Sequence, residues 1–184
     1  MSRRANATVE DLYGAPDKGK AEIVNGELIL MAPTGGVPAR AGGEIYVGLR
    51  EYERRTGGRG YAFPDNVGFL VNLPNRGSLS PDAAFYIGKL RGGLFLQGAP
   101  VFAAEVRSEN DYGPPAERAM ADKRRDYFAA GTLVVWDVDV LRDQVVRVYR
   151  GGDPGHPTVY RRGEVAEAEP AVPGWSMPVD RLFS

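Results

Sequence analysis

Residues 82–87 read Asp-Ala-Ala-Phe-Tyr-Ile, and residues 100–106 read Pro-Val-Phe-Ala-Ala-Glu-Val. Both runs are short and mostly apolar, and turn-forming residues surround them, which predicts two buried β-strands. Each run carries one acid: Asp82 opens the first and Glu105 lies near the end of the second. A carboxylate in a buried strand needs a partner, because acids are seldom buried unpaired. We therefore expect a sheet that presents two acids to a common site.

Residues 115–130 are predicted to form a helix that ends at Gly131. At 100° per residue, Lys123 falls in the middle of the apolar stripe of this helix. A lysine in that position can extend to solvent, pair with a buried acid, or act in a site. Asp82 and Glu105 have no obvious partner nearby in the sequence, and this favours a site shared by the three side chains.

Two carboxylates and a lysine in one pocket suit a particular chemistry. Carboxylates that lie a few ångströms apart resist joint ionisation, and a divalent cation removes that conflict. Hard oxygen ligands suit Mg²⁺, which takes one or two carboxylates and a substrate phosphate. A nearby lysine can orient a water molecule or stabilise the charge that develops on phosphorus oxygens. The residues thus indicate a Mg²⁺-dependent phosphodiester hydrolase, with Mn²⁺ as a substitute ion.

The other predicted elements complete a fold in which helices interleave with strands. Asn25-Gly26 predicts a tight hairpin turn within residues 21–31, because both positions of such a turn favour positive φ. Residues 74–80, which contain Pro, Asn, Gly and Ser, are expected to form a loop. We also expect helices over 8–13 and 40–56, and strands over 61–72 (one or two), 133–139, 144–150 and 157–162. This order predicts a mixed α/β (α+β) fold, a mixed central β-sheet flanked by helices. We expect one domain over 1–184, with its core at about 8–162 and a Pro-rich C-terminal tail.

Composition limits the classes of protein that the chain resembles. Its 184 residues, 43% of them hydrophobic, suit one domain with a hydrophobic core. The net charge of −1 gives no global basic field for nucleic acid, although local patches can still bind phosphate. The chain has no cysteine, so disulfides are excluded, and we expect a cytoplasmic protein. No signal peptide or membrane-spanning run is apparent, so no membrane partner is expected.

These residues resemble the PD-(D/E)XK nuclease superfamily, and within it the Uma-type family of bacterial restriction endonuclease-like proteins. The resemblance spans roughly residues 8–150. It rests on the following features: the Glu22–Glu27 hairpin, Pro33, Ser80-Pro81-Asp82, Ala104-Glu105-Val106-Arg107-Ser108, Lys123 with Tyr127, Trp136-Asp137, and Val145 to Tyr149. It implies a restriction endonuclease-like core and DNA as substrate.

The resemblance also implies roles for individual residues. Asp82 and Glu105 would be metal ligands, with the Val106 carbonyl as a third. Glu22 matches an early acidic position and would be a further acid at the site, although a solvated hairpin residue is an equal alternative. The superfamily lysine normally lies two residues after the second acid, where this chain has Arg107, so the resemblance implies that Lys123 takes the lysine role.

Arg107, which departs from the usual pattern, also bears on function. Strand alternation predicts Arg107 on the same face as Glu105, from which it would contact the substrate phosphate. Arginine clamps phosphate well but is a poor proton shuttle. The histidine that many relatives carry near the start of the helix over 40–56 is a second departure, since that stretch offers only Arg40.

Three functions remain open on the sequence. The first is a metal-dependent endonuclease acting on DNA, expected as a homodimer because such folds often pair to address two strands. The second is a catalytically inactive nuclease-fold module that binds nucleic acid or a protein partner, suggested by Arg107 and the near-neutral charge. The third is a hydrolase that uses two acids without metal; tight Mg²⁺ or Mn²⁺ binding that depends on Glu105 would count against it.

Overall fold

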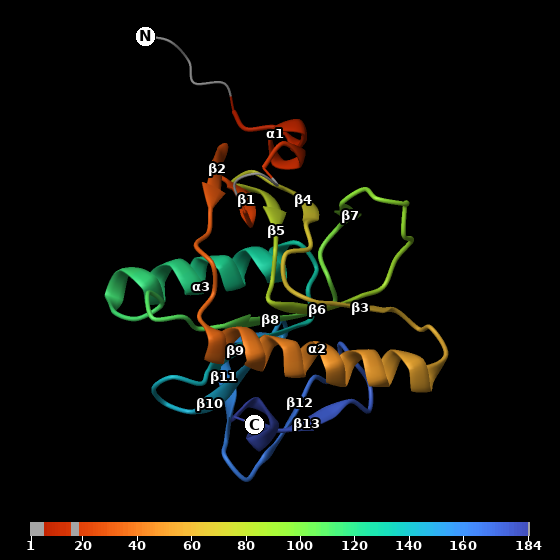
Figure 1. Cartoon of the computed structure of the whole chain (residues 1–184), viewed down its shortest axis with the longest axis vertical. Helices are drawn as coiled ribbons and strands as arrows, with labels where there is room; N and C mark the ends of the chain where they lie inside the picture. Colours follow the sequence, from red (N-terminus) through yellow and green to blue (C-terminus); the bar gives the residue numbers. More distant parts are fainter. Residues whose placement is uncertain (1–5, 16–18, 184) are drawn as a thin grey trace.

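A computed structural model of the chain describes residues 6–15 and 19–183 (Figure 1). Three α-helices and a set of short strands alternate along it, as the sequence predicts for a mixed α/β fold. The elements are, in order, α1 (Val9–Tyr13), β1 (Ala21–Val24), β2 (Glu27–Leu30), α2 (Gly36–Thr56), β3 (Tyr61–Phe63), β4 (Phe69–Leu73), β5 (Arg76–Leu79), β6 (Ala83–Tyr86), β7 (Leu96–Gln97), β8 (Phe102–Val106), α3 (Pro114–Ala129), β9 (Val134–Asp139), β10 (Val145–Arg150), β11 (Asp153–Arg161), β12 (Val165–Glu167), β13 (Ser176–Pro178) and the 3₁₀-helix η2 (Val179–Phe183). Within the described residues, no helix is both long enough and apolar enough to cross a lipid bilayer.

The strands form a mixed central sheet flanked by helices, as predicted, together with a second sheet and a small two-stranded ribbon. The larger sheet has the order β11-β10-β9-β8-β6-β3, with β8 and β9 parallel and the other neighbours antiparallel. The second sheet has the order β2-β1-β5-β4-β7, and β12 pairs with β13. Helix α3 connects the parallel pair β8 and β9, which need a crossover because a hairpin turn cannot join parallel strands.

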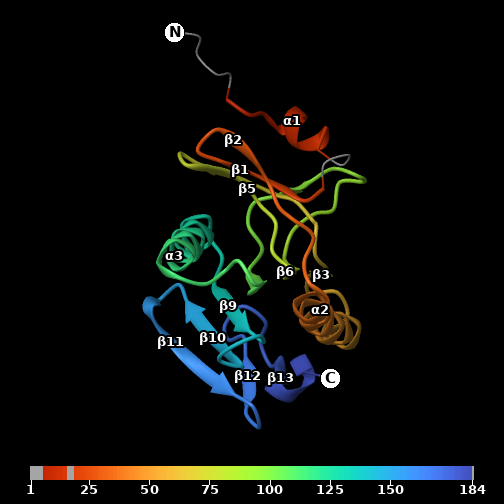
Figure 2. The same cartoon turned by 60° about the vertical axis from the view of Figure 1, so that its left-hand side comes forward.

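The six-stranded sheet is covered on both faces. On one face lies α2, which contacts β3, β6, β8 and η2. On the other face lies α3, and Figure 2 shows this helix between the six-stranded sheet and the second sheet. The side chains follow the alternation of a pleated strand. In β8, Phe102 and Ala104 join the core under α2, whereas Ala103 joins the core that contains Tyr127 of α3.

Strand β5 (Arg76–Leu79) corrects the prediction of a loop over 74–80. It pairs with β1 on one side and β4 on the other, so it lies inside the second sheet. The composition of β5 does not indicate a strand, because Arg76 and Ser78 are polar residues that are buried here and Gly77 packs against Ile23. Two carboxylate partners, described below, offset the cost of burying Arg76, and no local pattern reveals them.

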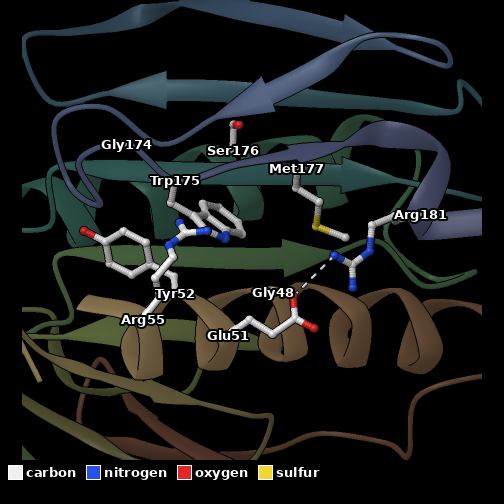
Figure 3. A pocket seen from close by; sticks show the side chains of 9 residues that line it. All are labelled: Gly48, Glu51, Tyr52, Arg55, Gly174, Trp175, Ser176, Met177 and Arg181. Atoms are coloured by element: carbon white, nitrogen blue, oxygen red, sulfur yellow. Dashed lines mark ion pairs between the residues drawn. The ribbon is translucent and has the colours of Figure 1, made fainter. Parts of the chain in front are cut away.

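The C-terminal segment is part of the core, which corrects the expected core boundary near residue 162 and the prediction of a tail. Trp175 is buried and stacks on Trp136 of β9 with ring centroids 5.1 Å apart. It packs against Gly48 of α2, where a Cβ would lie in ordinary van der Waals contact with the indole at 3.5 Å (Figure 3). Met177, Val179 and Leu182 complete the same apolar cluster. The Pro and Gly residues here shape turns between packed residues.

Helix α2 contains a glycine that the fold does not require. Gly43 is exposed, and a Cβ there would meet no atom within 4 Å. Gly43→Ala is expected to raise the free energy of unfolding by about 0.5–1 kcal/mol, because alanine restricts the unfolded chain and favours the helix. Urea denaturation followed by circular dichroism measures this change.

The matched comparison is Gly60→Ala in the loop before β3. A Cβ at Gly60 would lie 2.6 Å from Cε1 of Phe85 and 2.8 Å from the Tyr86 carbonyl oxygen. This variant is expected to lose about 1–3 kcal/mol through overpacking. Equal effects of the two substitutions would contradict the packing described for α2 and β3.

Candidate active site

Asp82, which directly precedes β6, lies next to Glu105 of the neighbouring strand β8. The antiparallel register of β6 and β8 pairs Ala83 with Ala104, and the Asp82 N–H donates to the Ala104 carbonyl at 3.0 Å. The Asp82 carboxylate in turn accepts the Val106 N–H at 2.7 Å, so Asp82 bonds the residues on both sides of Glu105. Both side chains are only partly exposed, at 15% and 20%. Two neighbouring carboxylates repel each other, so nearby cations stabilise this pair.

Helix α3 supplies the first cation and a hydroxyl, one turn apart. Lys123 Nζ lies 2.8 Å from Glu105 Oε1, and the Tyr127 hydroxyl donates to the same oxygen at 2.5 Å. Residues four apart share one face of a helix, so both groups reach Glu105 from the same side. The inward position of Lys123 that helical phase predicts is thus the one observed, and the first interpretation, extension to solvent, does not apply.

Glu22 of β1 reaches the same lysine from the second sheet. Its Oε1 lies 3.0 Å from Lys123 Nζ and accepts the Ser80 N–H at 2.8 Å. Its Oε2 lies 2.8 Å from Nη1 of Arg76, whose Nε is 2.6 Å from Asp126 of α3. Glu22 is 2% exposed, which corrects the alternative of a solvated hairpin residue. Both of its oxygens thus have partners, and Oε1 links the buried carboxylate to Lys123.

Lys20 is a further cation at the site that the sequence analysis missed. It directly precedes β1, and its Nζ lies 2.8 Å from Asp82 Oδ1 and 2.7 Å from Asp65 Oδ1. The other oxygen of Asp82 accepts the Val106 N–H at 2.7 Å. Lys20 lies two residues before Glu22, a spacing that puts both on one face of a strand, and this spacing is the signal that could have found it.

The shared burial shifts the pKa values of these groups. Burial raises the pKa of Glu105 above its usual range; Asp82 and Glu22 raise it further, while Lys123 and Lys20 oppose the rise. Burial alone would lower the pKa of Lys123, but Glu105 and Glu22 outweigh it and hold that pKa above its ordinary value. Burial and the nearby carboxylates raise the pKa of Tyr127 well above 10. At neutral pH, Lys123 is therefore an ammonium and a donor, and Tyr127 is a neutral phenol.

Arg107 does not fit the predicted contact with a substrate phosphate. Its guanidinium is 5% exposed and bonds both oxygens of Asp137, from Nε at 2.7 Å and from Nη2 at 2.8 Å. The guanidinium also donates to Glu117 of α3, with Arg107 Nη2 at 3.1 Å from Glu117 Oε2. The hydrogen bonds to Asp137 raise the pKa of Arg107, although burial opposes them. Strand alternation places the residue on the face toward α3, yet its donors are already used.

Known proteins resemble this chain in sequence and in fold. The model of the Uma2 family, described as "Putative restriction endonuclease", matches residues 7–180. The chain belongs to the Uma2 family. A comparison with curated proteins gave no match. A solved structure of a "putative nuclease belonging to DUF820" from Anabaena variabilis is similar at 17% identity, with a TM-score of 0.75, and the match covers 96% of this chain and 97% of that chain. At this identity the likeness shows that the two proteins share the fold.

In this Uma2 protein, the carboxylates that could bind a Mg²⁺ ion at the site are those of Asp82 and Glu105. Among residues 6–15 and 19–183, no three acidic, histidine or cysteine side chains are grouped closely enough to hold a metal. Asp82 and Glu105, however, present hard oxygens side by side. Oε1 of Glu105 already accepts from Lys123 and Tyr127, but in the described contacts each oxygen of Asp82 accepts from a single donor, so one lone-pair direction remains on each. Mg²⁺ typically takes one or two carboxylates and completes its shell with water and phosphate. The donor set fits that mode, with Val106 contributing its N–H to hold Asp82.

A cavity of about 270 Å³ lies elsewhere on the Uma2 fold, between α2 and the C-terminal segment. Arg55, Tyr52, Trp175 and Arg181 are among the residues that line it (Figure 3). Arg181 already pairs with Glu51, at 3.7 Å. Asp82, Glu105 and Glu22 are not among the residues that line this cavity, so we place the candidate active site at Asp82 and Glu105.

Proposed function

We propose that this Uma2 protein is a Mg²⁺-dependent endonuclease that hydrolyses DNA phosphodiester bonds, with Mn²⁺ as a substitute ion. One observation carries the proposal: Asp82 bonds the residues on both sides of Glu105, and Lys123 Nζ lies 2.8 Å from the Glu105 carboxylate. Two carboxylates and an ammonium group in this arrangement match the needs of phosphoryl chemistry. The family description and the fold shared with the Anabaena variabilis protein described as a putative nuclease support the same reaction class.

Each residue has a defined task in this proposal. Asp82 and Glu105 would hold the ion, which when bound polarises a phosphoryl oxygen and lowers the pKa of a bound water. Lys123 stays protonated, so it donates to the attacking water or to a phosphoryl oxygen where negative charge develops. Glu22 fixes the ammonium, and the Tyr127 hydroxyl fixes the Glu105 carboxylate. Lys123 is thus a donor rather than a general base.

The direct test uses the wild-type protein and supercoiled plasmid. Nicked and linear products are expected with Mg²⁺ or Mn²⁺, and none with excess EDTA. Cleavage that persists in EDTA would reject the metal-dependent mechanism. Plasmid that stays intact after prolonged incubation with either ion would reject the nuclease proposal.

Replacement of Lys123 tests its role as a donor. Lys123→Met is expected to lower single-turnover plasmid cleavage by about 10²-fold at saturating Mg²⁺, the usual loss when one charge-stabilising donor is removed. Lys123→Arg keeps a positive charge and should retain more activity. Arg125→Met is the matched control, because its side chain is 73% exposed on the same helix and pairs only with Asp122 in the described contacts. Full activity in Lys123→Met would remove this residue from the mechanism.

A second candidate function is a catalytically inactive module that binds nucleic acid or a protein partner. The observation in its favour is Arg107, which occupies the usual lysine position and is locked by Asp137 and Glu117. This candidate function predicts salt-sensitive DNA binding without cleavage.

We further propose a cytoplasmic homodimer, in which two active sites act on the two DNA strands. If this proposal is wrong, light scattering after gel filtration would show a monomer.

A further inference from the structure

Lys20 is held at the candidate active site by its backbone as well as by its side chain. The Lys20 carbonyl accepts the Met31 N–H at 2.9 Å, which extends the β1–β2 hairpin by one pair. Its side chain is 13% exposed, and its Nζ lies between Asp82 Oδ1 and Asp65 Oδ1. Lys20 therefore has two carboxylate acceptors within reach of a single ammonium position.

The two oxygens of Asp82 are used differently. Oδ2 is tied to the sheet through the Val106 N–H, whereas Oδ1 faces Lys20. A divalent cation bound to Asp82 Oδ1 would use the same carboxylate oxygen that Lys20 Nζ now contacts at 2.8 Å. The site would also have to hold Lys123, Lys20 and the ion together, and like charges a few ångströms apart oppose one another.

Asp65 offers Lys20 an alternative partner. Its side chain is 47% exposed, and its Oδ1 also accepts the Asn66 N–H at 2.7 Å, which fixes the carboxylate in the β3–β4 loop. A lysine side chain has a flexible four-carbon stem, so its ammonium can withdraw from Asp82 and remain paired with Asp65. No change of the backbone at β1 is required for this movement.

We propose that Lys20 is a positioning residue that competes with the divalent cation for Asp82. In the metal-free protein Lys20 pairs with both Asp82 and Asp65; when a divalent cation binds, Lys20 leaves Asp82 and keeps its pair with Asp65. The affinity of the site for the cation then depends on how easily Lys20 leaves Asp82. Asp65 favours this step because it keeps an ion pair with Lys20. This inference rests on the proposed role of Asp82 as a metal ligand.

Calorimetric titration of the full chain with Mn²⁺ tests the exchange without any measurement of cleavage. Lys20→Met is expected to tighten Mn²⁺ binding by about tenfold, because a charge-assisted hydrogen bond no longer has to be broken. Asp65→Asn is expected to weaken binding by a few-fold. The double variant is decisive, since the Asp65→Asn effect should largely vanish when Lys20 is absent. Lys89→Met, an exposed lysine after β6, is the matched control and should leave the affinity unchanged.

Several outcomes would overturn the inference. Lys20→Met with unchanged or weaker Mn²⁺ binding would reject competition, and so would an Asp65→Asn effect that is equal in both backgrounds. If Lys20→Met fails to fold, as circular dichroism would show, Lys20→Gln takes its place in the same single and double variants, and the same outcomes apply. Glu105→Gln separates the two proposals: if it abolishes Mn²⁺ binding while Lys20→Met changes nothing, only the role of Lys20 fails. If no variant alters binding, or if wild type and Lys20→Met both bind no Mn²⁺, the metal site and the exchange fail together.

Discussion

Asp82→Asn and Glu105→Gln are each expected to lower Mg²⁺-dependent plasmid cleavage by at least about a thousandfold. Both substitutions keep the size of the side chain and remove a charge that the ion requires. Loss of the ion removes several kcal/mol of charge stabilisation, and each 1.36 kcal/mol corresponds to a factor of ten in rate. The measurement is single-turnover cleavage at saturating Mg²⁺, with Mn²⁺ titration calorimetry beside it.

Two controls make this result specific. Glu109→Gln changes an exposed acid shortly after β8 and should cleave at the wild-type rate. Circular dichroism should show the same fold for all variants, because neither Asp82 nor Glu105 belongs to the apolar clusters that form the core. If Asp82→Asn and Glu105→Gln both retain wild-type cleavage and Mn²⁺ affinity, the site assignment is wrong.

Arg107→Met is expected to destabilise the protein by about 3–5 kcal/mol, because it leaves a buried carboxylate without its counter-ion. Asp137 is 1% exposed and loses two hydrogen bonds from the guanidinium. The remaining contact, from Arg124 Nη1 at 3.4 Å, is long and single. The measurement is the free energy of unfolding in urea at neutral pH. Cleavage by the folded fraction should persist, since Arg107 reaches no group of the active site.

Glu117→Gln and a double variant distinguish a buried ion pair from a general packing effect. Glu117 is half exposed, so its loss is expected to cost about 0–1 kcal/mol, as for surface pairs. Arg107→Met combined with Asp137→Asn should recover part of the stability lost in Arg107→Met, because the orphaned charge is gone. A double variant that is less stable by the full sum of both changes would argue that the two side chains do not interact.

The sequence alone determined the elements that carry the candidate site. Glu105 and the strand around it follow from an apolar run, and Lys123 follows from the phase of a helix. Both are periodic signals, and a side chain's direction is fixed locally once the period is known. The hairpin turn at Asn25-Gly26 follows in the same way, since both residues have positive φ in the structure.

Only the tertiary structure decided which charges meet. Arg107 has the predicted face but is bound by Asp137, thirty residues away, and Lys20 and Asp82 are sixty-two residues apart. Nothing in a local pattern distinguishes an arginine that binds phosphate from one that is neutralised by a buried acid. The segment around Trp175 is also decided only by the tertiary structure. Its Pro and Gly residues predict an irregular tail, but its apolar side chains pack against α2 and β9. Period and turn chemistry act over a few residues, whereas ion pairing and burial depend on distances that exist only after the chain has folded.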